Sequence, residues 1–226
     1  AGPLHWRRRP KAAMRRLGLG ERLAVHRYAA RFARGRAGWL PPRLWRYHAQ
    51  RYTLFSRYDA GIRLDEEMWY SVTPEPVARA QATRIAARGA SRGGVLLDGF
   101  CGAGGNCIQL ALHASDAHAS LVLGMDMELG RLSAAWHNAV IYGAERRLEL
   151  ICADFRSAPR LLRRGAVSGV FLSPPWADGG IMPQGAGGFS VRRLAAGLDG
   201  AALLRAALAL HGDVALFLPS ATRRRE

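Results

Sequence analysis

The sequence predicts an α/β protein built on a doubly wound, mostly parallel sheet, with a basic helical extension at its N-terminal end. From residue 93 onward, short apolar stretches alternate with helical patterns, which is typical of parallel strands covered by helices on both faces. A glycine-rich turn, Gly99-Phe-Cys-Gly-Ala-Gly-Gly105, follows the first of these strands. Aspartates end three successive strands, and such sheets bind their ligands beyond the strands' carboxyl ends.

The N-terminal part is predicted to be helical. Residues 4–36 are expected to form one or two arginine-rich helices, and residues 35–42 a break with two prolines. Residues 43–58 are expected to form a further helix, because Leu44, His48, Tyr52 and Phe55 are three or four positions apart. Thr73 followed by Pro74 predicts a helix start, because threonine caps helices and proline is tolerated at the first helical position. That helix is expected to end near residue 88.

The sheet is predicted from its apolar runs and the helices from three- and four-residue spacing. The expected strands are residues 95–97, 121–125, 148–152, 169–172 and 214–218, and the expected helices are residues 106–113, 129–142 and 191–210.

The positive charge is concentrated at the start of the chain. The 226 residues include 33 Lys and Arg against 17 Asp and Glu, a formal net charge of +16, and residues 1–63 hold 16 of the basic residues with only Glu21 and Asp59. We therefore expect an extension over residues 1–63 that binds RNA and a main domain over residues 64–226. Arginines interleaved with aromatics suit phosphate contact and base stacking; a solvated helix surface or a remnant of organelle targeting is the alternative.

Composition excludes several other classes. Hydrophobic residues make up 49% of the chain, and no apolar run reaches the roughly 18–20 residues that span a bilayer, so we expect a packed, soluble protein. Three cysteines without a CxxC pair indicate a reduced, intracellular protein. The seven histidines show no ligand spacing, so we expect no metal site.

The acids at the strand ends predict the cofactor. A carboxylate at Asp98 would repel a pyrophosphate but suits cationic sulfonium and ammonium groups, which favours S-adenosylmethionine over a dinucleotide. Asp126 can accept both ribose hydroxyls, and Asp154 with Phe155 can bracket the adenine. Ordinary turn-forming aspartates are the alternative.

Glycines in the turn after the first strand, among them Gly102 and Gly104, let the backbone approach a ligand closely beside a helix N-terminus. Such a turn alone is shared by several kinds of nucleotide site.

The stretch Ser173-Pro-Pro-Trp176 after the fourth strand predicts the acceptor side of a methyl-transfer site. Two prolines end ladder pairing and hold the following residue in a stiff, extended geometry. The Ser173 hydroxyl and the Pro174 carbonyl can accept hydrogen bonds from a nucleobase amine, and Trp176 can stack on the base, favouring a cationic one such as 7-methylguanosine. A proline-rich turn with a buried tryptophan is the alternative.

Five stretches together resemble the trimethylguanosine synthase family, RNA cap guanosine-N2 methyltransferases that form the 2,2,7-trimethyl cap. These stretches are residues 46–62, 69–75, 98–106, 138–143 and 173–176. The resemblance implies a fold of the class I S-adenosylmethionine-dependent methyltransferase type. It implies that Thr73, Asp98, Asn106, Asp126, Asp154 and Phe155 surround the cofactor.

For the substrate, the resemblance implies that Trp176 stacks on the methylated guanine with Ser71 against its other face, while Ser173 and Pro174 orient the amine. Arg46 stands where the family has a lysine facing the cap phosphates. Trp69 is expected to be a core residue, since bulky aromatics beside a site are more often packing.

The chain departs from the family pattern in three places. Ala177-Asp178 intervene before Gly179-Gly180, and Gly99 replaces a small side chain after Asp98. A helix and an antiparallel strand pair that normally follow the last predicted strand are expected to be missing, which leaves an open sheet edge for a protein or ribonucleoprotein partner to cover.

The function expected from these residues is methylation of N2 of the 7-methylguanosine cap of small RNAs. Two alternatives stay open: an N2-guanine or N6-adenine methyltransferase of ribosomal RNA, possibly organellar, and a catalytically idle homologue that serves as an RNA-binding or assembly factor. The resemblance implies the nucleus, and the N-terminal composition leaves the mitochondrion as the alternative location. The motifs do not distinguish one methyl transfer from two.

Overall fold

The computed structural model describes residues 40–87, 94–113, 119–163, 165–176, 189–220 and 222. The arginine-rich helices expected over residues 4–36 and the departure at Ala177-Asp178 lie outside the described residues. Within them, no helix has the length and apolar character needed to cross a membrane, and no three His, Cys, Asp or Glu side chains gather as a metal site.

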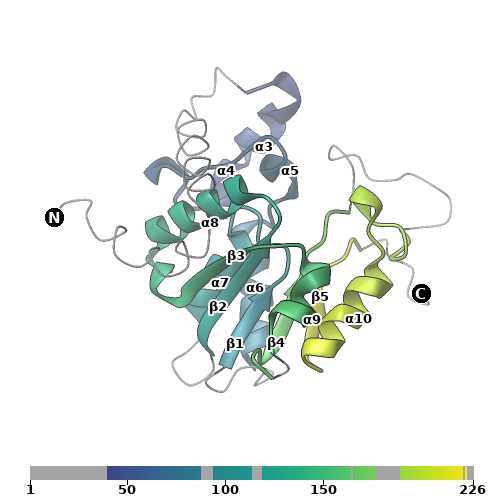
Figure 1. Cartoon of the computed structure of the whole chain (residues 1–226). Helices are drawn as coiled ribbons and strands as arrows, with labels where there is room; N and C mark the ends of the chain where they lie inside the picture. The colour runs from purple at the N-terminus through teal and green to yellow at the C-terminus, as the bar shows by residue number, and fades with distance from the viewer. Residues whose placement is uncertain are drawn as a thin grey trace, which may run out of the picture.

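A five-stranded parallel sheet in the order β3-β2-β1-β4-β5 forms the centre of the fold (Figure 1). Its strands are β1 Gly94–Asp98, β2 Ala119–Asp126, β3 Leu148–Cys152, β4 Gly169–Leu172 and β5 Val214–Leu216. All five predicted strands are confirmed, with small differences at the ends of β1, β2 and β5. The order reverses between β1 and β4, the switch point at which sheets of this kind bind ligands.

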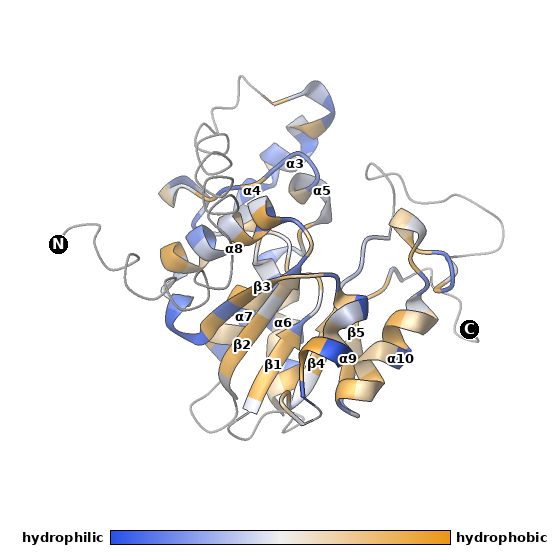
Figure 2. Ribbon diagram, viewed as in Figure 1, coloured by the Kyte–Doolittle hydropathy of each residue, from blue (hydrophilic) through white to orange (hydrophobic). Residues whose placement is uncertain are grey.

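Two apolar cores cover the two faces of the sheet. Successive residues of a strand face opposite sides, so Leu96 packs in one core and Leu97 in the other. The first core lies against α6 Glu75–Ala87, α7 Gly105–His113 and α8 Leu129–Tyr142, and the second against α9 Ala158–Leu161 and α10 Gly200–Leu210. Figure 2 shows that the strands between these layers are strongly hydrophobic.

The helices at residues 75–87, 105–113 and 129–142 agree with the predictions, whereas the predicted helix at residues 191–210 is only half right. Helix α10 begins at Gly200, where the Asp199 carboxylate accepts a hydrogen bond from the Ala201 N–H. Ahead of it, Ala196 and Gly197 have φ values of 56° and 67°, which an α-helix does not tolerate. A capping aspartate preceded by this turn therefore sets the helix start.

The single helix predicted over residues 43–58 is also wrong, because this stretch forms four short pieces. They are the 3₁₀ turn Pro42–Leu44, α3 Trp45–Ala49, α4 Arg51–Leu54 and the 3₁₀ turn Tyr58–Ala60. Gln50 interrupts the helix, and Phe55 is extended. Leu54, at the end of α4, and the extended Phe55 that follows it are both buried in the core.

Residues 40–63 pack on the same core as the helices of the sheet. Leu44, Leu54, Phe55 and Ile62 are buried in one cluster with residues of the glycine turn and α8. The short helix α5 Met68–Ser71, which the sequence did not predict, follows this segment. The boundary at residue 63 between an N-terminal unit and the main domain stays a prediction.

Asn138 on α8 fastens the N-terminal segment to the glycine turn. Its side chain is fully buried, accepts from the Arg63 N–H at 2.8 Å, and donates to the carbonyls of Arg63 and Ala103 at 3.0 Å each. One amide therefore satisfies backbone groups of two loops that are 40 residues apart in sequence.

We expect Asn138→Ala to lower the free energy of unfolding by about 2–4 kcal/mol, because it leaves buried backbone groups without partners. Urea unfolding followed by circular dichroism measures this. Val140→Ala, at a 48% exposed position on the same helix, is the control and should change stability by less than about 0.5 kcal/mol. Equal effects of the two substitutions would contradict the bridging role.

Candidate cofactor and substrate site

The glycine turn that follows β1 forms the floor of the candidate site. Gly102 and Gly104 have φ values of +51° and +84°, which favour glycine. A Cβ at Gly104 would lie 3.1 Å from the Ala135 Cα of α8, so the turn approaches that helix closely. A Cβ at Gly102 would meet no atom within 4 Å, so this part of the turn leaves room for a ligand.

Asp126, at the end of β2, holds the turn and stays accessible. Its carboxylate accepts hydrogen bonds from the backbone N–H groups of Gly102 and Glu128, at 2.9 Å each. Burial raises the pKa of Asp126, and these two hydrogen bonds oppose the shift. The residue keeps part of its surface exposed, and a carboxylate has lone pairs for further donors. The residue therefore fits the predicted role of accepting ribose hydroxyls.

Asp98, at the end of β1, is placed differently, because none of it is exposed. Its carboxylate accepts from the Phe100 N–H and from the Cys107 thiol, at 3.2 Å each. Burial raises its pKa to about 6. The carboxylate thus faces the inside of the turn and shapes it, and in this structure a cationic ligand cannot reach it directly.

Asp154 and Phe155, after β3, are also engaged by the protein. Asp154 caps the 3₁₀ turn Phe155–Ser157 and forms an ion pair with Arg156 at 2.6 Å, which lowers the pKa of its carboxyl. Phe155 is buried, with its ring centroid 5.9 Å from that of Phe100. A Cβ at Gly99 would lie 2.5 Å from the Phe155 ring. The glycine after Asp98 therefore makes room for this phenyl ring beneath the turn.

Thr73, two residues before α6, and Asn106, the second residue of α7, both lie close to the N-terminus of α7. Thr73 is buried, and its carbonyl oxygen would be 3.5 Å from a Cβ at Gly105. The Asn106 amide donates to the Gln81 side chain of α6 at 2.7 Å. The structure thus brings these two predicted residues to the N-terminus of the helix that follows the glycine turn.

The stretch Ser173-Pro-Pro-Trp176 follows β4 beside this turn. The Gly99 N–H donates to the Phe171 carbonyl at 3.0 Å, which joins the ends of β1 and β4. The Trp176 indole N–H donates to the Phe217 carbonyl at 3.1 Å, and the two rings meet edge to face with centroids 4.8 Å apart. Among the described residues the Ser173 hydroxyl has no hydrogen-bond partner, so it can bind a ligand.

Arg46 and Ser71 come from neighbouring short helices, and both are exposed. Arg46 on α3 donates to the Tyr47 hydroxyl at 2.8 Å and stacks on that ring. The rings of Tyr47 and Tyr70 lie 6.2 Å apart, which brings α3 beside α5, where Ser71 is the last residue. Trp69 of α5 is 4% exposed, so the prediction that it is a core residue is confirmed.

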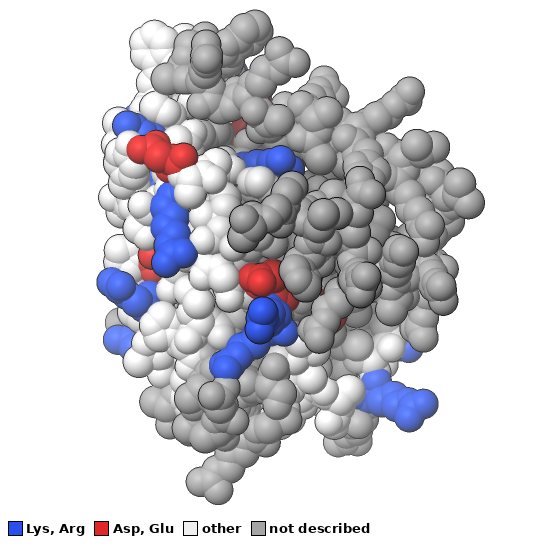
Figure 3. Space-filling model, turned by 90° about the vertical axis from the view of Figure 1, so that its left-hand side faces the viewer, with Lys and Arg blue, Asp and Glu red and all other residues white. Residues whose placement is uncertain are grey.

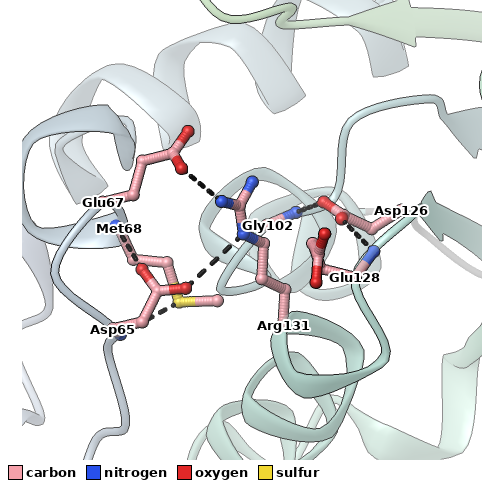
Figure 4. Close-up of polar contacts among 7 residues, drawn as sticks. All are labelled: Asp65, Glu67, Met68, Gly102, Asp126, Glu128 and Arg131. Carbon is pink, nitrogen blue, oxygen red and sulfur yellow. Dashed lines mark hydrogen bonds and ion pairs between the residues drawn. The ribbon is translucent and has the colours of Figure 1, made fainter. Parts of the chain in front are cut away.

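The sequence did not indicate a network around Arg131 of α8 (Figure 4). Its guanidinium forms an ion pair with Glu67 at 2.5 Å and lies 3.5 Å from Asp65. No spacing pattern links these acids to an arginine more than 60 positions away. Figure 3 shows further arginines beside acidic side chains on one face, so part of the positive charge of the described residues is paired.

A family model described as RNA cap guanine-N2 methyltransferase matches residues 93–226. The chain belongs to this family. The resemblance drawn from the sequence is thereby confirmed, and the parallel sheet agrees with the class I methyltransferase fold that it implied. Family and fold together imply S-adenosylmethionine as the methyl donor.

Among the relatives of this family member is trimethylguanosine synthase of Schizosaccharomyces pombe, 37% identical over 140 residues, or 61% of this chain and 55% of that protein. The Saccharomyces cerevisiae trimethylguanosine synthase is 34% identical over 139 residues, which are 59% of this chain and 42% of that protein. The chain thus spans about half the length of the curated relatives it matches. A solved structure of TrmN from Thermus thermophilus is 27% identical in sequence, with a TM-score of 0.39. The match covers 46% of this chain and 29% of the TrmN chain.

The environment of Asp98 predicts a pH dependence of stability. Its pKa is raised in the folded state, so its contribution to stability is fully present below its unfolded pKa, near 3.8, and is lost as the pH rises through about 6. The total loss is about 3 kcal/mol. Asp98→Asn should therefore flatten the fall in unfolding free energy between pH 4 and 6.

Urea unfolding at several pH values measures this slope. Asp154→Asn is the matched control, because the pKa of Asp154 is lowered and its contribution is instead lost as the pH falls. An Asp98→Asn protein with the wild-type slope would contradict the assignment.

Proposed function

We propose that this chain methylates the exocyclic N2 of the 7-methylguanosine cap of small RNAs, with S-adenosylmethionine as the methyl donor. The observation that carries the proposal is the placement of Ser173-Pro-Pro-Trp176 beside the glycine turn, through the hydrogen bond between Gly99 and Phe171. In this proposal, the stretch would supply the acceptors for a base amine, and the glycine turn beside it would bind the cofactor. Family membership supports the choice of the cap.

The acceptor residues act on the amine. An exocyclic amine is a weak nucleophile because its lone pair is conjugated with the base. The Ser173 hydroxyl and the Pro174 carbonyl accept its N–H groups, which turns the lone pair toward the reacting methyl group. When bound, S-adenosylmethionine supplies an electrophilic methyl group. The methylated amine then releases a proton to water, so no general base is assigned.

Trp176 is proposed to hold the cap. Its hydrogen bond to the Phe217 carbonyl and the edge-on contact with that ring fix the plane of the indole. A tryptophan face attracts a cationic ring by roughly 0.5–2 kcal/mol, and 7-methylguanine is cationic. Ser71 would cover the other face of the base. Arg46 would bind the cap phosphates, for which its guanidinium offers two parallel donors.

The cofactor is proposed to lie over the glycine turn. Asp126 would accept its ribose hydroxyls, and Gly102 and Gly104 let the backbone approach it. Asp98 acts through the turn that it shapes. Thr73 and Asn106 would line the start of α7, and Asp154 with Phe155 would lie on the adenine side.

The extension over residues 1–63 is proposed to bind the RNA beyond the cap, because it carries most of the net positive charge. Binding of this kind weakens with added salt. The resemblance to trimethylguanosine synthases makes the nucleus the proposed location, and a fluorescent fusion viewed beside a mitochondrial marker tests it.

We expect the protein to transfer label from S-adenosylmethionine to m7GpppG and not to GpppG. The two substrates differ only in the N7-methyl group, which makes the guanine ring cationic and so suited to the face of Trp176. Uncapped ribosomal RNA fragments serve as the third substrate. Label in ribosomal RNA alone would replace the proposal by a ribosomal RNA methyltransferase. Absence of both methylation and cofactor binding would leave an RNA-binding homologue.

Trp176→Ala should weaken m7GpppG binding at least about fivefold, because base–aromatic stacking contributes about 1–3 kcal/mol per base. Affinity for S-adenosylmethionine, measured by calorimetry on the same preparation, should stay within about twofold. Trp176→Phe keeps an aromatic face but loses the hydrogen bond to Phe217, so an intermediate effect is expected. Equal loss of cap and cofactor binding in Trp176→Ala would show that the tryptophan is structural.

A further inference from the structure

Arg131 lies between the two halves of the candidate site. It belongs to the first turn of α8, and its side chain is 25% exposed. Figure 4 shows its guanidinium between Asp65 and Glu67 on one side and the Gly102–Asp126 contact on the other. It is therefore close to both the segment that leads to Ser71 and the carboxylate proposed to bind the cofactor ribose.

On the first side, Arg131 holds the segment that enters α5. A terminal nitrogen of its guanidinium binds Glu67, four residues before Ser71. Its Nε lies 3.5 Å from Asp65, and the other oxygen of Asp65 accepts from the Met68 N–H that starts α5, at 2.7 Å. A displacement of Arg131 would thus be transmitted to the helix that ends at Ser71.

On the second side, Arg131 belongs to the same turn as the backbone that fixes Asp126. Its N–H donates to the Glu128 carbonyl at 2.9 Å, and the Glu128 N–H in turn donates to the Asp126 carboxylate at 2.9 Å. Burial raises the pKa of Asp126, and the positive charge of Arg131 is among the influences that oppose this rise. The arginine therefore favours the ionised form that accepts ribose hydroxyls.

The Nε of Arg131 is buried and has no hydrogen-bond partner within the described part of the chain. A buried donor without a partner is costly. A small shift toward Asp65 would satisfy it, so the present contact at 3.5 Å leaves room for the network to tighten.

We propose that Arg131, as a positioning residue, couples the two halves of the site, so that a ligand held by Asp126 strengthens the binding of a cap against Ser71. This inference rests on the proposed function. Coupling between two sites is reciprocal and typically changes affinity 5- to 150-fold. The cofactor and the cap would each bind more tightly when the other is present.

The test is calorimetric titration of the protein with m7GpppG, with and without saturating S-adenosylhomocysteine, which keeps the ribose and prevents turnover. In the wild type we expect at least about fivefold tighter cap binding with S-adenosylhomocysteine present. Glu67→Gln and Arg131→Met should bring this ratio close to one, and Arg131→Lys, which keeps the charge, should retain part of it.

Glu66→Gln is the matched control. It makes the same change in charge one position away, on a glutamate that pairs with Arg43 and not with Arg131, at the surface. Its coupling ratio should equal that of the wild type. A ratio shared by Glu67→Gln and Glu66→Gln would overturn the inference, as would a Glu67→Gln protein that binds both ligands more weakly with an unchanged ratio.

Hydrogen exchange gives a readout that needs no cap. S-adenosylhomocysteine should slow amide exchange over residues 62–72 in the wild type and in Glu66→Gln, but not in Glu67→Gln. Protection without cap binding would refute the proposed function and keep Arg131 as the link to this segment. Cap and S-adenosylhomocysteine binding without protection or coupling would refute the link alone, and a wild type that does not bind S-adenosylhomocysteine would refute both.

Discussion

The attachment of residues 55–72 to helix α8 is the constraint on which the candidate site depends. Asn138 joins this segment to the glycine turn through three hydrogen bonds to backbone groups. One turn further along the helix, the Tyr142 hydroxyl donates to Glu75 at 2.6 Å and accepts from the Arg57 N–H at 3.2 Å. Because α8 also packs on the sheet, this one helix fixes residues 55–72 and the glycine turn relative to each other. Polar groups buried in this way rigidify a structure when all are satisfied.

The three acids at the strand ends show how one residue type is adapted to three tasks by its surroundings. Asp98 is buried under the turn and has a raised pKa, Asp126 is partly open with a raised pKa, and Asp154 is held ionised by Arg156. Asp126 shares its carboxylate with the backbone of the turn and keeps part of its surface exposed. The other two stabilise the loops around it, Asp98 from inside the turn and Asp154 as a helix cap.

The sequence predicted the sheet well because buried parallel strands are continuous apolar runs, and it predicted where the acids lie because strand ends share one edge. It did not predict where the carboxylates point. The Asp98 carboxylate faces the protein because it accepts a hydrogen bond from the Cys107 thiol, which α7 brings beneath the turn. The spacing of residues in the sequence does not predict this contact. The helix predicted over residues 43–58 was wrong because the chain leaves helical geometry at Gln50 and becomes extended at Phe55, and residue spacing does not reveal such interruptions.

The departure at Gly99 illustrates how a local change is absorbed by packing. With no side chain at this position, the Phe155 ring approaches to a distance that a Cβ would forbid, and the phenyl group completes the core under the turn. Interiors are packed as densely as crystals, so a missing side chain is costly unless a neighbour fills its volume. Gly99 and Phe155 therefore act as a pair. The Phe155 ring packs against the inner side of the turn, while the outer side, at Gly102, would leave an added Cβ with no neighbouring atom within 4 Å and is open to a ligand.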